Sequence, residues 1–253
     1  MRRYWIEKNQ ITNETVHFLG EQFHHIFDVC RQTVGHHFEV ITDDSKAYLV
    51  KVETISKKSA TAKIIENREI KKLDYPHIHV LISVPRYNVF DSTLERCVEM
   101  GVTSITPFVS DYSFIRKEKE LPAGKYDRWN KIIISATQQS GRGELLKINE
   151  LTNFNQLVKK INPDEKNWCL FAYEGKTQSS VNIEIGRLRQ KYATTADHIY
   201  ILVGSEGGFS QQEVLMIESL GLHPVTLGQQ ILRVETACLT LVAILKYELG
   251  LLQ

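Results

Sequence analysis

Two glycine-rich loops near the carboxyl end place the tightest constraint on how this chain can fold. The first, residues 203–210, reads Val-Gly-Ser-Glu-Gly-Gly-Phe-Ser, and the second, residues 227–237, reads Leu-Gly-Gln-Gln-Ile-Leu-Arg-Val-Glu-Thr-Ala. Each loop follows a short apolar run with β-strand character, and each leads into a helical pattern. A strand, a glycine turn and a helix together direct backbone N–H groups and the positive end of a helix dipole toward one cavity. The two loops therefore predict a pocket for a small polar ligand.

The composition is that of an ordinary soluble globular protein. The chain has 253 residues, of which 42% are hydrophobic and 24% charged, and its formal net charge is only +1. Because there is no overall basic field, nucleic acid would have to be bound by local patches. The first residues lack the apolar segment of a signal peptide, and the longest strongly apolar run, 239–245, is far shorter than the ~20 residues of a membrane span. We therefore expect a cytoplasmic protein that does not enter a membrane.

The cysteines indicate a reducing environment. Cys30, Cys97, Cys169 and Cys238 lie far apart, mostly within apolar runs, and no two of them form a Cys-x-x-Cys pair. The histidines do not fall at zinc-ligand spacing either. We expect buried thiols, no disulfide framework and no metal site.

Residues 1–72 predict a small β-rich barrel with one helix. Strands are expected at 36–41, 47–55 and 60–65, where β-branched residues are frequent and a turn falls at 56–59. Between residues 21 and 31, apolar residues at 23, 26, 27 and 30 recur at helical spacing. About 72 residues are few for an independently stable barrel, so we expect contacts with the rest of the chain to stabilise this domain.

Residues 73–253 predict an α/β domain. A charged linker at 67–75 ends at Pro76, and strands then alternate with helices, which implies a mostly parallel sheet covered on both faces. Two sequences have the form of a helix-starting capping box, one at Ser92 and one at Ser210. Strands are expected at 77–84, 105–109, 168–172, 198–203 and 223–227, and helices at 92–101, 126–139, 181–191, 210–220 and 234–249.

The two loops leave alternatives open when read residue by residue. Gly204 through Gly208 could form only a tight strand-to-helix turn, and they match neither the dinucleotide fingerprint nor a P-loop, which counts against a nucleotide-dependent α/β enzyme. Arg233 and Glu235 could be a solvated cation and a carboxylate that favours a helix start, or a polar pair at the rim of an apolar pocket.

Taken together, the loops resemble the signature of the bacterial small-subunit ribosomal RNA uridine-N3 methyltransferases, members of the SPOUT superfamily. The pattern is Gly-Ser-Glu-Gly-Gly-Phe-Ser-x-x-Glu followed by Leu-Gly-x-x-Ile-Leu-Arg-x-Glu-Thr-Ala. Residues 96–102 are similar to the family's Lys-Ala-Thr-Glu-Leu-Gly-Val segment, and residues 139–142 to its Gln-Ser-x-Arg. In the first domain, 25–29, Arg31 and Gly35 resemble the family's His, Val-Leu-Arg and Gly.

The chain departs from the family pattern at several positions. Ser205 stands where the family usually has Pro, Gln230 where it has Arg, Val234 where it has Thr, and Arg96 where it has Lys. The usual Pro after Gln-Ser-x-Arg is absent. These changes leave open a different target base, and they motivate the rival hypothesis of an RNA-binding module that has lost methyl transfer.

The resemblance implies a fold and a function that composition and spacing do not. It implies a SPOUT α/β domain with a deep trefoil knot, preceded by a PUA-like RNA-binding barrel, in a homodimer. It implies S-adenosyl-L-methionine as cofactor and N3 of a uridine in 16S ribosomal RNA of the small subunit as target.

The same resemblance implies roles for individual residues. Arg233 is expected to stabilise the uracil anion, with Glu235 orienting it or drawing the N3 proton through water. Arg2, Arg3, Arg31 and Arg142 are expected to contact RNA. The residues expected to hold the cofactor are Val203, Gly204, Ser205, Glu206, Gly207, Gly208, Leu227, Gly228, Ile231, Leu232, Thr236 and Ala237.

Overall fold

The computed structural model of the chain divides into two compact units. It describes residues 2–175, 179–192 and 196–252. The first unit comprises Met1–Lys72 with Ile134–Leu145, and the second comprises Leu73–Ile133 with Leu146–Gln253. The segment Ile134–Leu145, which the sequence analysis assigned to the second domain, therefore groups with the first unit.

The first unit is built on a curled six-stranded sheet. Its order is β1-β4-β5-β6-β3-β2; β1 runs parallel to β4 and the other neighbours are antiparallel. Two register shifts between β5 and β6 mark bulges, which bend and twist a strand pair. The three predicted strands are confirmed, whereas β1 to β3 were not predicted. The strands are β1 (Arg3–Trp5), β2 (Ile11–Thr12), β3 (Thr15–Leu19), β4 (His37–Ile41), β5 (Lys46–Ile55) and β6 (Ser59–Glu69).

Helical turns link these strands. A 3-10 turn, η1 (Lys8–Gln10), precedes β2, and after β3 the chain enters α1 (Gly20–Phe23), which continues as one π-helical stretch, η2 (His24–Val29). The predicted helix is thus confirmed, and its apolar face is buried through Phe23, Ile26 and Phe27. Arg31, at φ +53°, takes a left-handed conformation just beyond the helix end.

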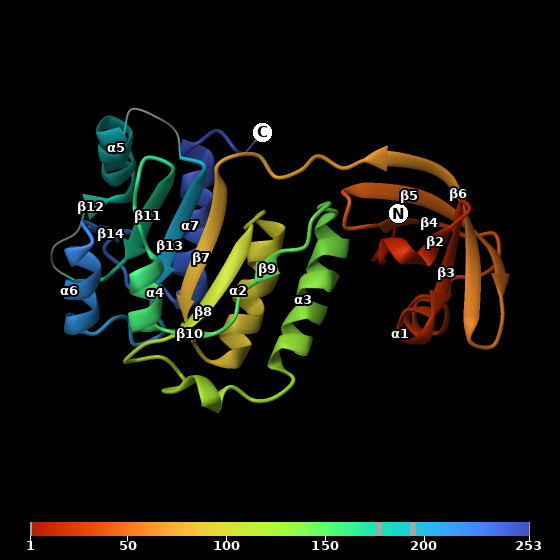
Figure 1. Cartoon of the computed structure of the whole chain (residues 1–253), viewed down its shortest axis with the longest axis horizontal. Coiled ribbons are helices and arrows are strands. Elements are labelled where there is room, and N and C mark those ends of the chain that lie inside the picture. The colour runs from red at the N-terminus through yellow and green to blue at the C-terminus, as the bar shows by residue number, and fades with distance from the viewer. Residues whose placement is uncertain (1, 176–178, 193–195, 253) are drawn as a thin grey trace. The chain divides into compact units, whose positions relative to one another are not determined.

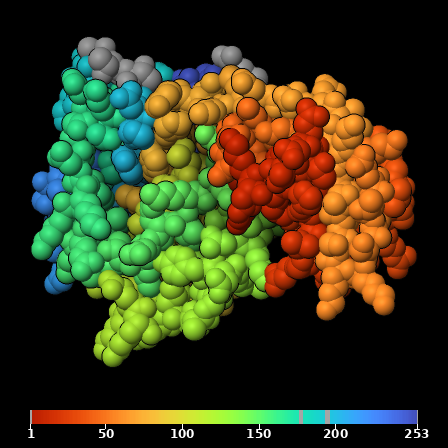
Figure 2. All heavy atoms as spheres, turned by 45° about the vertical axis from the view of Figure 1, so that its right-hand side comes forward, coloured from red at the N-terminus to blue at the C-terminus, as the bar shows by residue number. Residues whose placement is uncertain are grey.

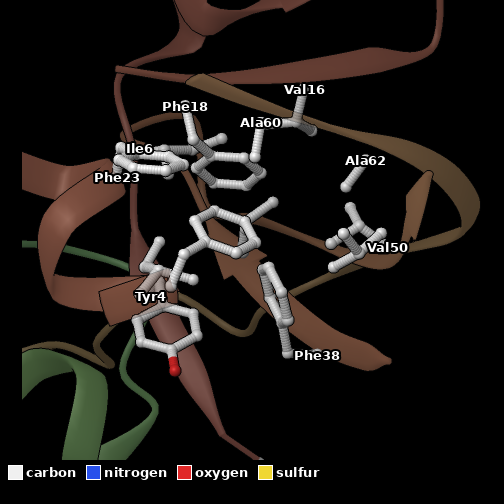
Figure 3. Packing of buried hydrophobic residues seen from close by; sticks show 13 residues of the cluster. Tyr4, Ile6, Val16, Phe18, Phe23, Phe38, Val50, Ala60 and Ala62 are labelled. Carbon is white, nitrogen blue, oxygen red and sulfur yellow. The ribbon is translucent and has the colours of Figure 1, made fainter. Parts of the chain in front are cut away.

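Aromatic rings form the centre of the first unit's core. The Phe38 ring meets Phe18 at 5.8 Å and Tyr4 at 5.0 Å between centroids, both edge to face, and Figure 3 shows these rings converging with Phe23 and Val50. Edge-to-face pairs add to the stabilisation from burial. In Figure 2 the red N-terminal residues lie against the orange strands of this unit, so residues far apart in the sequence share the core.

The second unit is built on an entirely parallel sheet of eight strands, as the alternation of strands and helices predicted. Its order is β10-β8-β7-β13-β11-β14-β12, and β9 pairs with β8. The strands are β7 (His77–Ser83), β8 (Ser104–Val109), β9 (Lys147–Ile148), β10 (Thr152–Asn153), β11 (Asn167–Ala172), β12 (Ser179–Ser180), β13 (His198–Val203) and β14 (Pro224–Thr226).

Helices cover both faces of this sheet (Figure 1). On one face α4 and α6 pack on β7, β8, β11 and β13 through one apolar cluster, and on the other α2 packs against α7, which contacts β13. The helices from residue 73 onward are α2 (Tyr87–Glu99), η3 (Glu118–Glu120), α3 (Lys125–Ser140), α4 (Phe154–Lys160), α5 (Val181–Tyr192), α6 (Gln211–Ser219) and α7 (Val234–Glu248). The second half of α3, from Ile134, groups with the first unit.

Two boundary predictions were wrong. The helix expected to start at Ser92 begins at Tyr87, because its apolar spacing extends back to the buried Phe90, so Ser92 lies inside the helix and does not cap it. The charged segment predicted as a linker from residue 67 contributes its first three residues to β6. The second capping box is confirmed, since Ser210 accepts a hydrogen bond from the N–H of Glu213 and the Glu213 side chain returns to the N–H of Ser210.

All four cysteines are free, and three of them are buried as predicted, whereas Cys30 is not. Cys97 and Cys238 lie buried with their sulfurs 3.7 Å apart between α2 and α7, Cys169 is buried in β11, and Cys30 is partly buried. Within the described part of the chain, no helix combines the length and apolar character that a membrane crossing requires.

Histidine and tyrosine rings line up across the amino ends of β7 and β13. His79 Nδ1 lies 2.7 Å from Ser104 Oγ, its Nε2 lies 3.0 Å from Nδ1 of His198, and its ring stacks on Tyr200 at 4.8 Å between centroids. Burial, together with the like charges of His198 and His77, lowers the pKa of His79 to about 4. The His79 ring is therefore neutral at physiological pH.

The low pKa of His79 predicts a loss of stability in mild acid. The unfolded chain binds a proton at this residue near pH 6.5 and the folded chain only near pH 4, so the contribution is constant above about pH 6.5 and falls as the pH drops toward 4. The slope is at most about 1.4 kcal/mol per pH unit, and partial exposure of the ring reduces it. Denaturant unfolding between pH 7.5 and 4.5 should show a shallower decline for His79→Asn than for the wild type. His223→Asn, at an exposed position, is the control; equal slopes in all three proteins would contradict the assignment.

Candidate ligand pocket at the carboxyl ends of the strands

A cavity of about 580 Å³ lies where β11, β13 and β14 end. Its wall combines residues 203–206 and 208, which follow β13, with residues 225–235 and 237, which run from β14 into α7. In open α/β sheets, ligands bind outside the carboxyl ends of the strands, and cavities of this size hold small molecules. The two glycine-rich loops thus meet at one pocket, as their sequences predicted.

The loop after β13 is a tight turn that needs its glycines. The N–H of Gly208 donates to the carbonyl of Ser205 at 2.9 Å, and Gly208 has φ +68°. A Cβ on Gly204 would lie 2.9 Å from both the Cα and the carbonyl carbon of Gly208, which is closer than van der Waals contact allows. The close approach of these two glycines forms the cradle at the pocket wall.

Side chains of this loop tie it to neighbouring segments. Ser205 is buried, and its hydroxyl donates to the carbonyl of Tyr112 at 2.7 Å. Glu206 accepts a hydrogen bond from the N–H of Arg86, the residue before α2, at 3.0 Å. Ser205, which stands where the resembled family usually has Pro, therefore connects the loop to the segment at Tyr112.

A buried carboxylate supports the loop from behind. Glu213 of α6 accepts hydrogen bonds from the N–H groups of Ser210 and Asp111, both at 2.9 Å, while burial raises its pKa. The Ser210 hydroxyl in turn donates to the Asp111 carboxylate. Glu213 thus connects the capping box at the start of α6 to Asp111, about one hundred residues earlier in the sequence. These two hydrogen bonds fix the start of α6, which follows the first glycine-rich loop.

The second loop brings the predicted catalytic residues to the pocket. Gly228 has φ +124°, and Thr226 Oγ1 accepts from its N–H and donates to its carbonyl, which closes the turn. Arg233 is the N-cap residue of α7 and is exposed, and Glu235 lies in the first helical turn. Both line the cavity, and no ion pair or hydrogen bond between them is found in the part of the chain that the structure describes.

Most of the residues expected to hold a cofactor come together here. All of them line the cavity except Gly207 and Thr236. Gly207 instead packs on Tyr112, where a Cβ would meet the Tyr112 Cβ at 2.8 Å. Thr236 is exposed in the first turn of α7.

Two other stretches of the pocket wall were not predicted from the sequence. Arg86 and Asn88 enter from the start of α2, and Tyr173 and Glu174 follow directly after β11. A Cβ on Gly208 would lie 2.4 Å from Oε1 of Glu174, so this carboxylate packs on the glycine cradle. The first stretch follows β7 and the second follows β11, each at the carboxyl end of a parallel strand, where ligands bind in such sheets. Their position after predicted strands was therefore the signal in the sequence that could have identified them.

The four arginines expected to contact RNA all belong to the first unit. Arg2 and Arg31 are exposed, whereas Arg3 donates from Nε to Glu39 at 2.9 Å. The Arg3 guanidinium also lies against Gly141, where a Cβ would come within 2.6 Å of it, so Arg3 approaches the residue next to Arg142. Arg142 is partly buried, and burial lowers its pKa to about 10, so it remains charged at neutral pH.

Fold and site together define an α/β protein with a small-ligand pocket at the carboxyl ends of parallel strands, preceded by a small β unit. The family model described as RNA methyltransferase domain matches residues 71–246, and the model described as RNA methyltransferase PUA domain matches residues 18–65. The chain therefore belongs to the RNA methyltransferase family, with the PUA domain at its amino end.

Similarities to individual proteins support this family assignment. The chain is 28% identical to the ribosomal RNA small subunit methyltransferase E of Bacillus subtilis, over 100% of this chain and 99% of that protein. It is 31% identical to the protein of the same name from Aquifex aeolicus, over 89% and 91% of the two chains. The crystal structure of this enzyme from Neisseria gonorrhoeae, bound to S-adenosyl methionine, has a TM-score of 0.81 at 27% identity and covers 98% of each chain. The fold predicted from the resemblance is confirmed at the level of its two domains.

Proposed function

We propose that this protein is an S-adenosyl-L-methionine-dependent methyltransferase that modifies N3 of a uridine in 16S ribosomal RNA of the small subunit. The observation that carries the proposal is the single cavity in which both glycine-rich loops, Arg233 and Glu235 meet. The names of the full-length relatives support the substrate class, and the bound cofactor of the Neisseria enzyme supports the cofactor.

The pocket fits this cofactor. Its volume of about 580 Å³ is in the range of small-ligand sites, and the glycine cradle lets a ligand approach backbone groups closely. Backbone groups of 204–208 and 227–232 would hold the adenine edge and the amino-acid part, while the carboxylates of Glu174 and Glu206 at the wall complement a positively charged ligand. When bound, S-adenosylmethionine supplies an electrophilic methyl group on a sulfonium.

Arg233 and Glu235 would then act on the uracil. Methylation at N3 requires loss of the N3 proton, which leaves negative charge on the neighbouring carbonyl oxygens. The exposed guanidinium of Arg233 is placed at the pocket wall to stabilise that charge. Glu235 makes no ion pair with Arg233 within the described residues, so its carboxylate is available to draw the N3 proton through a water molecule.

The cysteines give no support to methylation at carbon C5, which requires a nucleophile such as a thiolate. Cys238, the cysteine nearest in sequence to the loop, is fully buried with its sulfur against Cys97. Its thiol is thus part of the packing between α2 and α7.

The proposal extends to the rest of the molecule. The first unit would bind RNA, in which Arg2, Arg31 and Arg142 supply positive charge and Arg3 helps to position the Arg142 segment. A homodimer and a trefoil knot in the second unit remain predictions from the resemblance.

A binding and transfer experiment tests the assignment. The protein should bind S-adenosylmethionine in a calorimetric titration and should transfer a labelled methyl group to small ribosomal subunits that lack the modification. Incorporation into RNA supports the enzyme. Absence of both cofactor binding and incorporation would favour the rival hypothesis, an RNA-binding module without methyl transfer.

A further inference from the structure

A second cavity of about 680 Å³ lies within the second unit, on the sheet face that carries α4. It shares no lining residue with the methyl-transfer pocket. Side chains of four strands form its floor, and β9 and the end of α4 form its sides; these elements can be followed in Figure 1. The floor residues are Leu81, Thr106, Cys169 and Tyr200.

The rim of this cavity carries positive charge that has no ion-pair partner among the described residues. Lys147 of β9 and Lys160 at the end of α4 both line it and are exposed, and neither makes an ion pair within the described residues. Glu150 is the only acidic residue in the described wall, so the lining residues carry a net positive charge, and the Asp164 carboxylate lies behind Asn167 without lining the cavity. Two unpaired ammonium groups beside one cavity are suited to an anionic group such as a phosphate.

The wall offers fixed hydrogen-bonding groups. The Asn149 side-chain N–H donates to Thr106 Oγ1 at 2.8 Å, and the Asn167 side-chain N–H donates to Asp164 at 2.9 Å. Each amide is thereby oriented, and each keeps a carbonyl oxygen that accepts no hydrogen bond from the described residues. Such oxygens can accept from the amino group of a base.

The floor is suited to a flat ring. The Tyr200 ring, which lines the cavity, stacks on His79 at 4.8 Å between ring centroids, and its hydroxyl makes no hydrogen bond to a described residue. Burial raises the pKa of the Cys169 thiol to about 12, so this thiol stays neutral and behaves as an apolar surface beside Leu81. An apolar floor, an unpaired hydroxyl and oriented amides complement the face and the edge of a base.

We propose that this cavity is a second nucleotide site, which binds a ribonucleotide through its phosphate at Lys147 and Lys160 and its base over Tyr200. The nucleotide is either part of an RNA strand or a free mononucleotide. The site does not depend on methyl transfer, because it lies on a different set of residues from the catalytic pocket.

The first test uses uridine 5′-monophosphate and adenosine 5′-monophosphate with the full-length protein, followed by NMR or calorimetry. At least one of them should bind, the matching nucleoside without phosphate should bind at least about tenfold more weakly, and the double variant Lys147→Ala/Lys160→Ala should lose at least about tenfold in affinity. Tyr200→Phe, which removes one hydroxyl and keeps the ring, should weaken binding by a smaller factor. Lys159→Ala is the matched control, since Lys159 is an exposed neighbour on α4 that does not line the cavity.

The second test separates the two sources. Fluorescence anisotropy with a labelled single-stranded RNA should show weaker binding for the double lysine variant if the nucleotide belongs to RNA, and unchanged binding if the site takes free nucleotides. The proposal is overturned if neither mononucleotide binds and RNA affinity is equal in the wild type, Lys147→Ala/Lys160→Ala and Lys159→Ala. Calorimetry with S-adenosylmethionine on the same proteins reports the first pocket independently, so failure of this site and failure of the proposed methyltransferase function are distinguishable.

Discussion

Replacing Arg233 by Ala should reduce methyl transfer to small ribosomal subunits by about 10²- to 10³-fold, while the affinity for S-adenosylmethionine stays within a few-fold. Arg233 is exposed at the N-cap of α7 and lines the pocket, so its removal leaves the packing of the helix intact. A preorganised donor aimed at charge that develops in the transition state contributes about 3–4 kcal/mol, which corresponds to that loss of rate. Single-turnover transfer of a labelled methyl group and calorimetric cofactor binding measure the two quantities separately.

Two further variants sharpen this result. Arg233→Lys keeps the charge and loses the planar guanidinium, and it should recover only part of the activity. Lys191→Ala, which removes an exposed cation of α5 that does not line the pocket, should transfer at the wild-type rate. Full activity of Arg233→Ala would contradict this role for Arg233, and another residue of the pocket wall would then have to stabilise the uracil anion.

Replacing Gly204 by Ala should lower the affinity for S-adenosylmethionine by at least about 100-fold. The added Cβ would lie 2.9 Å from backbone atoms of Gly208, so the turn must open and the cradle is lost. The obstacle is backbone and not the end of a flexible side chain, which means that no rotamer change relieves it. Loss of close ligand contacts worth about 3 kcal/mol corresponds to the expected drop in affinity.

Gly186→Ala provides the matched control for Gly204→Ala. Gly186 lies inside α5, and a Cβ there meets nothing within 4 Å. This variant should keep cofactor affinity and gain up to about 1 kcal/mol of stability from the better helix propensity of Ala. If Gly204→Ala bound the cofactor as well as Gly186→Ala does, the turn described here would not form the cofactor site.

The fold was predictable where the sequence pattern is long. The parallel sheet, α3, α6 and α7 followed from repeated apolar spacing, and Gly101 and Gly221 follow the ends of their helices at positive φ as expected. The short strands β1, β9, β10 and β12 carry too few residues to show a period, and they were missed. The start of α2 was misplaced because a local capping pattern at Ser92 competed with apolar spacing that begins earlier.

The wall of the first pocket was predictable where its residues are contiguous. Of the twelve residues expected to hold the cofactor, ten line this pocket, as do Arg233 and Glu235, and all of these lie in the two loops. Arg86 and Glu174 were missed because the pairing order of the strands, with β13 between β7 and β11, brings distant segments together. The spacing of apolar residues in the sequence can indicate each strand separately, but it does not indicate the order in which the strands pair in the sheet.

Methylation of uridine at N3 can be tested by nucleoside mass analysis of 16S ribosomal RNA after unmodified small subunits have reacted with this protein and labelled S-adenosylmethionine. We expect labelled 3-methyluridine at one position, in an amount that Arg233→Ala reduces and Lys191→Ala does not. Label in 5-methyluridine, in a ribose methyl group or in another base would contradict the assignment of N3 as the methylated atom.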